Sequence, residues 1–249
     1  MKTVILAGGL GTRLSEITKS IPKPLVKVGK LPILIHIFEI YLKYGHNQFY
    51  ILTGYKGHLI KKYFKDLKSF TQIQQDKNYY HFKNTKKNYE VFLIDTGKYT
   101  QTGLRLKKIQ KIINDEDFFL TYGDGLANID LNELFSFHKK KKSYLTISAV
   151  RPPARFGEII FNRGSVKSFE EKNNINSGWI NGGFMVVNKK FFKCISNKNQ
   201  MLEREPFQLC LAKKKLFAIK HYKFWQCMDN LRDKKLLDNL SKKTKPPWR

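Results

Sequence analysis

Residues 3–13 read TVILAGGLGTR, an apolar run that passes into a loop with three glycines. The run over 3–7 is apolar at nearly every position, which is typical of a strand buried on both faces of a parallel sheet. Ligands of open α/β sheets bind beyond the carboxyl ends of the strands, where this loop would lie. We therefore predict a central strand near the N-terminus, followed by a ligand-binding loop.

The alternation of strands and helices continues along the chain. Apolar runs and helical spacing predict strands over 49–52, 91–94, 117–122 and 144–150, and helices over 33–44, 58–68 and 131–141. Strands that alternate with helices indicate βαβ units. The predicted fold class is α/β, with a Rossmann-like, mostly parallel sheet and helices on both faces. Residues 70–90 have no clear period and are predicted to form an irregular excursion.

The pattern changes after Arg151. Short strands separated by turns are predicted over 157–161, 165–170 and 183–187. Such strands indicate a small mixed or antiparallel element laid over the edge of the main sheet. A helix is predicted over 233–240, and Pro246-Pro247 is expected to end the ordered chain.

The composition is that of a globular protein. The chain has 249 residues, of which 41% are hydrophobic, so it is neither disordered nor collagen-like. Its apolar runs are too short to span a membrane. Cys194, Cys210 and Cys227 are odd in number and far apart, which disfavours a disulfide scaffold. Because the N-terminus also has no signal-peptide pattern, we predict a cytoplasmic protein.

The chain is strongly basic. Its formal net charge is +27, from 47 Lys and Arg residues against 20 Asp and Glu residues. Such a field attracts anions, and nucleic acid is the first partner to consider. However, the lysines are spread along the chain, and neither zinc-finger spacing nor an RNP-like aromatic motif occurs. We favour a solvated surface, and then steering of phosphate ligands, over a nucleic-acid-binding face.

The glycine loop is the first sign of chemistry. Gly8, Gly9 and Gly11 allow close approach of a ligand and expose backbone N–H groups that suit phosphate oxygens. Their spacing fits neither a P-loop nor a dinucleotide fingerprint. Arg13 adds planar donors for phosphate, and Lys23 follows between two prolines. An ordinary strand–turn–helix loop with a surface arginine is the alternative, but the combination favours phosphate binding.

Two aspartates are the second sign. Asp124 lies between two glycines after an apolar strand, and Asp229 ends a similar run much later in the chain. Mg²⁺ binds one or two carboxylates together with the phosphates of a substrate. The alternatives are a turn former at Asp124 and a helix N-cap at Asp229. Together with the loop, the pair favours a magnesium site.

Several short motifs follow one another along the chain: Gly8-Gly9-x-Gly11-Thr12-Arg13-Leu14, Pro22-Lys23-Pro24, Tyr122-Gly123-Asp124-Gly125, Glu171-Lys172 and Asn181-Gly182-Gly183. Together they resemble the sugar-1-phosphate nucleotidylyltransferase superfamily. A second set is more specific: Asp95-Thr96-Gly97, Thr102-Gly103-x-Arg105-Leu106, Pro152-Pro153-x-Arg155-Phe156-Gly157, Trp179-Ile180-Asn181-Gly182-Gly183-Phe184 and Phe224-Trp225-Gln226-x-Met228-Asp229. This set is most similar to the glucose-1-phosphate cytidylyltransferases.

The resemblance implies a nucleotide-diphospho-sugar transferase fold, in which the small sheet is a sugar-binding insertion. It implies one domain over 1–249, with a nucleotide-binding part (1–150), a sugar-binding part (151–232) and a C-terminal helix and tail (233–249). The implied reaction transfers a cytidylyl group from CTP to α-D-glucose 1-phosphate. The products are CDP-glucose and pyrophosphate, and Mg²⁺ is the implied cofactor.

The resemblance also implies roles for single residues. Arg13 and Lys23 would be catalytic, and Asp124 and Asp229 would hold Mg²⁺. The implied nucleotide-binding residues are Leu6, Gly8, Gly9, Gly11, Thr12, Gly103, Arg105 and Gly123. The implied sugar-phosphate-binding residues are Gly157, Glu171, Lys172, Trp179, Asn181 and Gly182. Arg105 is predicted to read the two acceptors of cytosine, with a surface helix position as its alternative. Trp179 is either a pocket wall or a core residue.

Alternatives remain open on the substrate and on catalysis. Leu104 stands where the subfamily usually has a second glycine, so another nucleotide (UTP, dTTP or GTP) or another sugar 1-phosphate is the near alternative. A non-catalytic nucleotide-sugar or nucleic-acid binder is the remote one, which the complete set of charged motif residues disfavours. The resemblance further implies a homo-oligomer, a trimer of dimers being one form, and a role in surface polysaccharide biosynthesis.

Overall fold

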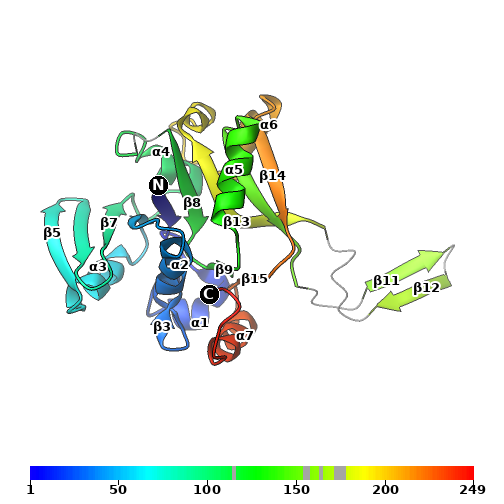
Figure 1. The fold of residues 1–249 in the computed structure, drawn as a ribbon, viewed down its shortest axis with the longest axis horizontal. Coiled ribbons are helices and arrows are strands. Elements are labelled where there is room, and N and C mark those ends of the chain that lie inside the picture. The colour runs from blue at the N-terminus through cyan, green and yellow to red at the C-terminus, as the bar shows by residue number, and fades with distance from the viewer. Residues whose placement is uncertain (114–115, 154–157, 163–164, 171–177) are drawn as a thin grey trace.

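The computed structural model describes residues 1–113, 116–153, 158–162, 165–170 and 178–249. Within these ranges the main feature is a nine-stranded sheet with the order β14-β10-β13-β8-β1-β4-β7-β6-β5 (Figure 1). All of its strands except β6 and β13 run in the same direction. The mostly parallel sheet predicted from the sequence is therefore confirmed.

The four central strands are parallel to one another. β1 (Lys2–Leu6) lies between β8 (Asp117–Tyr122) and β4 (Gln48–Thr53), and β7 (Tyr89–Asp95) follows β4. Each corresponds to a predicted strand. The chain forms β4 and β7 on one side of β1 before it crosses to β8 on the other. The carboxyl ends of β1 and β8 are therefore a topological switch point, where ligands of α/β sheets bind.

Helices cover both faces of the sheet, as predicted. The apolar side chains of α2 (Ile33–Leu42), α3 (Gly57–Asp66) and α5 (Leu131–Lys141) enter one core. Those of α4 (Thr102–Lys107) and α6 (Glu205–Ala212) enter a second core on the opposite face. Alternate side chains of the central strands point into one core or the other, so these strands are apolar at almost every position.

Residues 70–90 hold two strands, so the prediction of an irregular excursion is wrong. β5 (Phe70–Asp76) and β6 (Tyr79–Asn84) extend the sheet beyond β7, each antiparallel to its neighbour. β5 is the edge strand, and nearly all of its residues are exposed. A register shift between Gln72 and Gln74 also interrupts its pairing. With no buried face, β5 carries no alternating apolar pattern, and only its pairing with β6 makes it a strand.

The strand predicted over 183–187 belongs to the main sheet and not to an element over its edge. β13 (Ile180–Asn188) pairs antiparallel with both β8 and β10 (Leu145–Val150). Its side chains enter both cores, and a strand buried on both faces must lie inside the layered sheet. This corrects its predicted position.

The remaining strands lie at the edge or outside the main sheet. β14 (Leu216–His221), which was not predicted, pairs parallel with β10. β11 (Glu158–Asn162) and β12 (Ser165–Glu170) form a separate antiparallel hairpin, as expected for the small element after Arg151, but the hairpin stands away from the main sheet and does not lie over its edge (Figure 1). Shorter elements are η1 (Thr12–Leu14), α1 (Ser15–Thr18), η2 (Lys23–Leu25), β2 (Lys27–Val28), β3 (Leu31–Pro32), β9 (Gly125–Ala127), η3 (Lys189–Cys194) and β15 (Trp225–Cys227).

The C-terminal segment packs onto the body of the protein. α7 (Leu231–Ser241) confirms the predicted helix. Order does not end at Pro246-Pro247, because Trp248 is only 2% exposed and its Nε1 donates to His36 Nδ1 at 3.3 Å. Burial of the large indole ring holds the tail in place and corrects that prediction. None of the described helices has the length and apolar character that a membrane crossing requires.

Candidate active site

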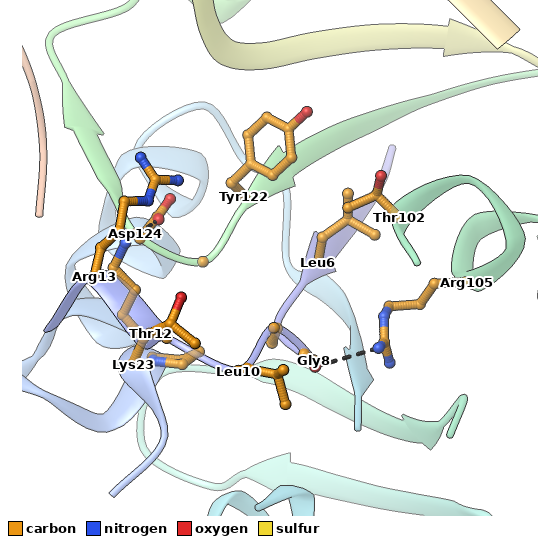
Figure 2. Close-up of a pocket in the computed structure, with 15 residues that line it drawn as sticks. Leu6, Gly8, Leu10, Thr12, Arg13, Lys23, Thr102, Arg105, Tyr122 and Asp124 are labelled. Carbon is orange, nitrogen blue, oxygen red and sulfur yellow. Dashed lines mark hydrogen bonds and ion pairs between the residues drawn. The ribbon is translucent and has the colours of Figure 1, made fainter. Parts of the chain in front are cut away.

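A pocket of about 270 Å³ opens at the carboxyl ends of β1 and β8 (Figure 2). The predicted site residues that line it are Leu6, Gly8, Gly9, Gly11, Thr12, Arg13, Lys23, Arg105, Gly123 and Asp124. Its lining is completed by Ala7, Leu10, Pro24, Thr102 and Tyr122. Figure 2 shows two ends of this pocket, one around Arg13, Lys23 and Asp124 and the other around Arg105, with the glycine loop between them.

Glycine is required at two points of the loop. Gly11 has a φ of 68°, a backbone conformation that residues with a side chain rarely adopt. At Gly8 an added Cβ would clash with the guanidinium of Arg105. The loop therefore combines a left-handed turn at Gly11 with a close contact between Gly8 and Arg105.

Arg105 fastens this loop to its neighbours. The residue is 2% exposed, so the alternative of a surface helix position is wrong. Its guanidinium donates to the carbonyl oxygens of Gly8, Thr53, Gly97 and Thr100 and to the hydroxyl of Thr96. Burial lowers the pKa of Arg105 to about 10. These contacts join the glycine loop to the ends of β4 and β7, whereas a contact with cytosine stays a prediction.

Asp124, at the opposite end of the pocket, lies close to Asp229, the other predicted metal ligand. Lys23 Nζ donates to Asp124 Oδ2 at 2.6 Å and to Asp229 Oδ1 at 2.7 Å. Arg13 Nη1 lies 2.6 Å from Asp229 Oδ2. Burial lowers the pKa of Lys23, but the carboxylates of Asp124 and Asp229 outweigh it, so the pKa is raised above 10.5. Segments far apart in the chain thus place two carboxylates around one ammonium.

The simpler alternatives for the two aspartates fare differently. Asp229 is not the N-cap of α7, because Asn230 is, and its side chain accepts a hydrogen bond from Asp233 N at 2.9 Å. Asp124 does lie in the turn between β8 and β9. That turn is tied to the run before Asp229, since Met228 N donates to Asp124 O at 2.9 Å. The turn therefore presents the Asp124 carboxylate to the site.

A second cavity of about 490 Å³ adjoins the carboxylate pair. Asp229 lines this cavity, whereas Asp124 lines the glycine-loop pocket, and Lys23 bridges the two side chains. The other residues lining it are Pro152, Pro153, Ile180, Trp225, Gln226, Cys227, Asn230, Arg232, Asp233 and Leu236. The carboxylate pair therefore stands at the junction of the two cavities.

Among the described residues, Trp179, Asn181, Gly182 and Gly103 do not line the glycine-loop pocket. Trp179 lines a third cavity of about 460 Å³, where Arg151 and Lys220 lie over its ring and Tyr222 packs at its edge. Gly182 O accepts a hydrogen bond from the indole of Trp225.

Asn181 Oδ1 accepts a hydrogen bond from Gly183 N at 2.9 Å. Gly103 does not line the glycine-loop pocket, because the close approach that it allows is to the backbone of Gln200. Gly157, Glu171 and Lys172 lie outside the described residues.

The sequence analysis assigned no role to Tyr122, Thr102 or Glu203. Tyr122 and Thr102, which both line it, donate hydrogen bonds to the carboxylate of Glu203. Burial, together with the charge of Glu203, raises the pKa of Tyr122 well above its usual value. Tyr122 stands directly before the Gly-Asp-Gly motif, which was the available signal. Nothing local marks Glu203, because its partners lie about 80 to 100 residues away in the chain.

The donor set fits a hard divalent cation. In the parts of the chain that the structure describes, no group of three or more His, Cys, Asp or Glu side chains is arranged so that it could hold a metal ion. Asp124 and Asp229 offer carboxylate oxygens and already surround a cationic group. Mg²⁺ commonly takes one or two carboxylates and completes its shell with water and substrate phosphates, so a pair of this kind is sufficient.

Comparison with known proteins places these features in context. The family model described as "Nucleotidyl transferase" matches residues 2–226. A glucose-1-phosphate cytidylyltransferase of Salmonella typhimurium is 42% identical over 255 residues, covering 100% of this chain and 99% of that protein. A probable glucose-1-phosphate cytidylyltransferase of Bacillus subtilis is 39% identical, covering 94% of this chain and 93% of that protein.

A solved structure shares the fold. HddC of Yersinia pseudotuberculosis, crystallised with GMP-PN, has a TM-score of 0.70 and 24% identity, covering 97% of this chain and 99% of that one. At this identity the likeness concerns the arrangement of helices and strands.

Proposed function

This chain belongs to the nucleotidyl transferase family, and we propose that it transfers the cytidylyl group of CTP to α-D-glucose 1-phosphate. The products are CDP-glucose and pyrophosphate. The observation that carries the proposal is the pair Asp124 and Asp229, held by Lys23 between the glycine-loop pocket and the second cavity. One cavity then takes the nucleotide and the other takes the sugar phosphate.

The reaction makes few demands on acid–base chemistry. A phosphate oxygen of glucose 1-phosphate, already anionic, attacks the α-phosphorus of CTP. A new P–O bond forms as the bond to the β-phosphate oxygen breaks, and pyrophosphate leaves with that electron pair. Catalysis therefore consists of positioning and charge neutralisation.

We assign the following parts in this positioning to residues of the site. The N–H groups of Gly8, Gly9 and Gly11 face phosphate oxygens, and Arg13 neutralises the leaving pyrophosphate. Lys23 lies beside the reacting phosphates. Mg²⁺ on Asp124 and Asp229 supplies charge neutralisation at the nucleotide phosphates when it is bound.

We place the sugar phosphate in the second cavity. Asn181 and Gly182 belong to the predicted sugar-phosphate set, as do Gly157, Glu171 and Lys172, which lie beyond the described residues. Trp179 faces the third cavity, so its contact with the sugar phosphate stays a prediction. The same holds for the division of the chain at residues 150 and 232.

The proposal is tested by measuring pyrophosphate release with Mg²⁺ and glucose 1-phosphate, using CTP, UTP, dTTP, ATP and GTP in parallel. We expect CTP to be preferred at least tenfold, which corresponds to about 1.4 kcal/mol of transition-state discrimination. Preference for UTP, dTTP or GTP would support the nucleotidyl transfer reaction and would show that CTP is not the substrate. Turnover with none of the five would contradict the proposal for this sugar phosphate, and other sugar 1-phosphates are then tested.

The cellular setting follows from the same assignment. We propose that the enzyme works in the cytoplasm as a homo-oligomer and serves surface polysaccharide biosynthesis. The support is the resemblance of the motifs and the buried thiols of Cys194 and Cys210, which contact each other and are not joined by a disulfide.

A further inference from the structure

Lys23 lies where a metal ion would bridge the two carboxylates. Its ammonium donates to Asp124 at 2.6 Å and to Asp229 at 2.7 Å, and its side chain is only 13% exposed. The two carboxylates are 28% and 18% exposed. An ammonium and a divalent cation cannot share this position, because both need the same oxygens and repel each other.

Two cations already pair with the two carboxylates. Lys23 donates to both Asp124 and Asp229, and Arg13 donates to Asp229. A divalent cation that enters alone must displace the ammonium of Lys23 and leave it close to a new positive charge. That displacement opposes metal binding to the free protein.

A bound triphosphate changes this pairing. Lys23 and Arg13 line the glycine-loop pocket as well as touching the carboxylates. The backbone around Lys23 is held by the flanking Pro22 and Pro24, and Pro24 packs against Gly123, so the flexible stem is the part that can move. Phosphate oxygens in the pocket would give the ammonium a new partner and would give the metal additional ligands.

We propose that Lys23 is a placeholder for the metal: it holds Asp124 and Asp229 together in the free protein, keeps divalent cations out, and moves to the nucleotide phosphates when the metal takes its place. This inference rests on the proposed function. In the free protein, the affinity for a divalent cation is then set by its competition with the ammonium of Lys23. The metal and the nucleotide therefore bind together.

The first test measures Mn²⁺ binding to the metal-free protein without nucleotide, by electron paramagnetic resonance. Lys23→Gln should bind Mn²⁺ at least tenfold more tightly than the wild type, although it should be less active. Lys23→Arg keeps the competing charge and should bind Mn²⁺ as weakly as the wild type. Lys27→Gln, a matched loss of charge at an exposed position of β2, should also leave the affinity unchanged. Equal Mn²⁺ affinity in Lys23→Gln and the wild type would overturn the proposal.

The second test needs no variant. Acetylation of each lysine by acetic anhydride is followed by peptide mass spectrometry, without Mn²⁺ and at a high Mn²⁺ concentration that the paramagnetic resonance titration shows to fill the site in the wild type. We expect Lys23 to react slowly in the metal-free protein and faster once Mn²⁺ has displaced it, while Lys27 reacts equally in both. If the rate at Lys23 does not change, the displacement does not occur. Neither test requires turnover. If the protein is inactive, the proposed function is wrong, and the Mn²⁺ affinities and acetylation rates still test the role of Lys23.

Discussion

Replacement of Arg105 by methionine distinguishes two roles for a buried guanidinium. Methionine keeps much of the apolar volume of the side chain and removes all of its hydrogen bonds. In the structure the guanidinium fastens the glycine loop, whereas in the sequence-based prediction it reads cytosine. We expect Arg105→Met to destabilise the free protein and to weaken binding of every nucleotide to a similar degree.

The magnitude follows from the acceptors that are left behind. Thr53 O keeps donors from Thr96, both from its N at 3.1 Å and its Oγ1 at 2.7 Å. Thr100 O loses its donor, which lies at 2.6 Å, whereas Gly97 O and Gly8 O keep only long hydrogen bonds from Thr100 N at 3.5 Å and Tyr55 N at 3.4 Å. Losing the partner of a buried acceptor costs about 1–3 kcal/mol. The variant no longer buries a charged group, which offsets part of this cost. We therefore expect the free energy of unfolding to fall by about 2–4 kcal/mol.

For a chain of this length, that loss corresponds to a fall in Tm of roughly 5–15 °C. Thermal melting of the ligand-free protein measures it, with Lys111→Met, at an exposed position just after α4, as the control. Nucleotide selectivity is then compared between CTP and UTP. An unchanged Tm together with loss of the preference for CTP would refute the fastening role and assign Arg105 to the base.

Three substitutions in the site and a change of pH give four further tests. Gly8→Ala places a Cβ against the Arg105 guanidinium, so nucleotide affinity should fall at least tenfold in equilibrium titrations, and unaltered affinity would argue against the close packing. Glu203→Gln removes the charge that holds two pocket side chains, so the KM for nucleotide should rise about fivefold with little change in kcat; a fall in kcat alone would contradict this positioning role. Asp124→Asn should reduce Mg²⁺-dependent turnover at least a thousandfold while circular dichroism stays unchanged, and near-normal turnover would remove Asp124 from the metal site. Burial lowers the pKa of four histidines below 6.5 in the folded protein, namely His36, His46, His138 and His221. The unfolded chain therefore binds more protons than the folded one as the pH falls through 6.5, and the free energy of unfolding should decrease between pH 7 and 5. Urea titrations measure this free energy, and a value that does not change with pH would contradict the expectation.

The sequence by itself determined the centre of this protein. The strands around β1 are predictable because a strand covered on both faces must be apolar at nearly every position, and that pattern is local. The glycine loop is predictable for a similar reason, since a positive φ at Gly11 and the tight contact at Gly8 leave little choice of residue. Asp124 and Asp229 were predicted as a pair because each follows an apolar run, and the structure brings both side chains to Lys23.

Only the tertiary structure decided how these pieces meet. β5 is a strand through its pairing with β6, and the place of β13 depends on which elements cover its two faces. The partners of Arg105 and Glu203, and the position of Lys23 between two aspartates, join residues that are up to about 200 positions apart. Hydrogen bonds and ion pairs of this kind depend on distance in space, which the order of residues along the chain does not specify until the sheet has formed.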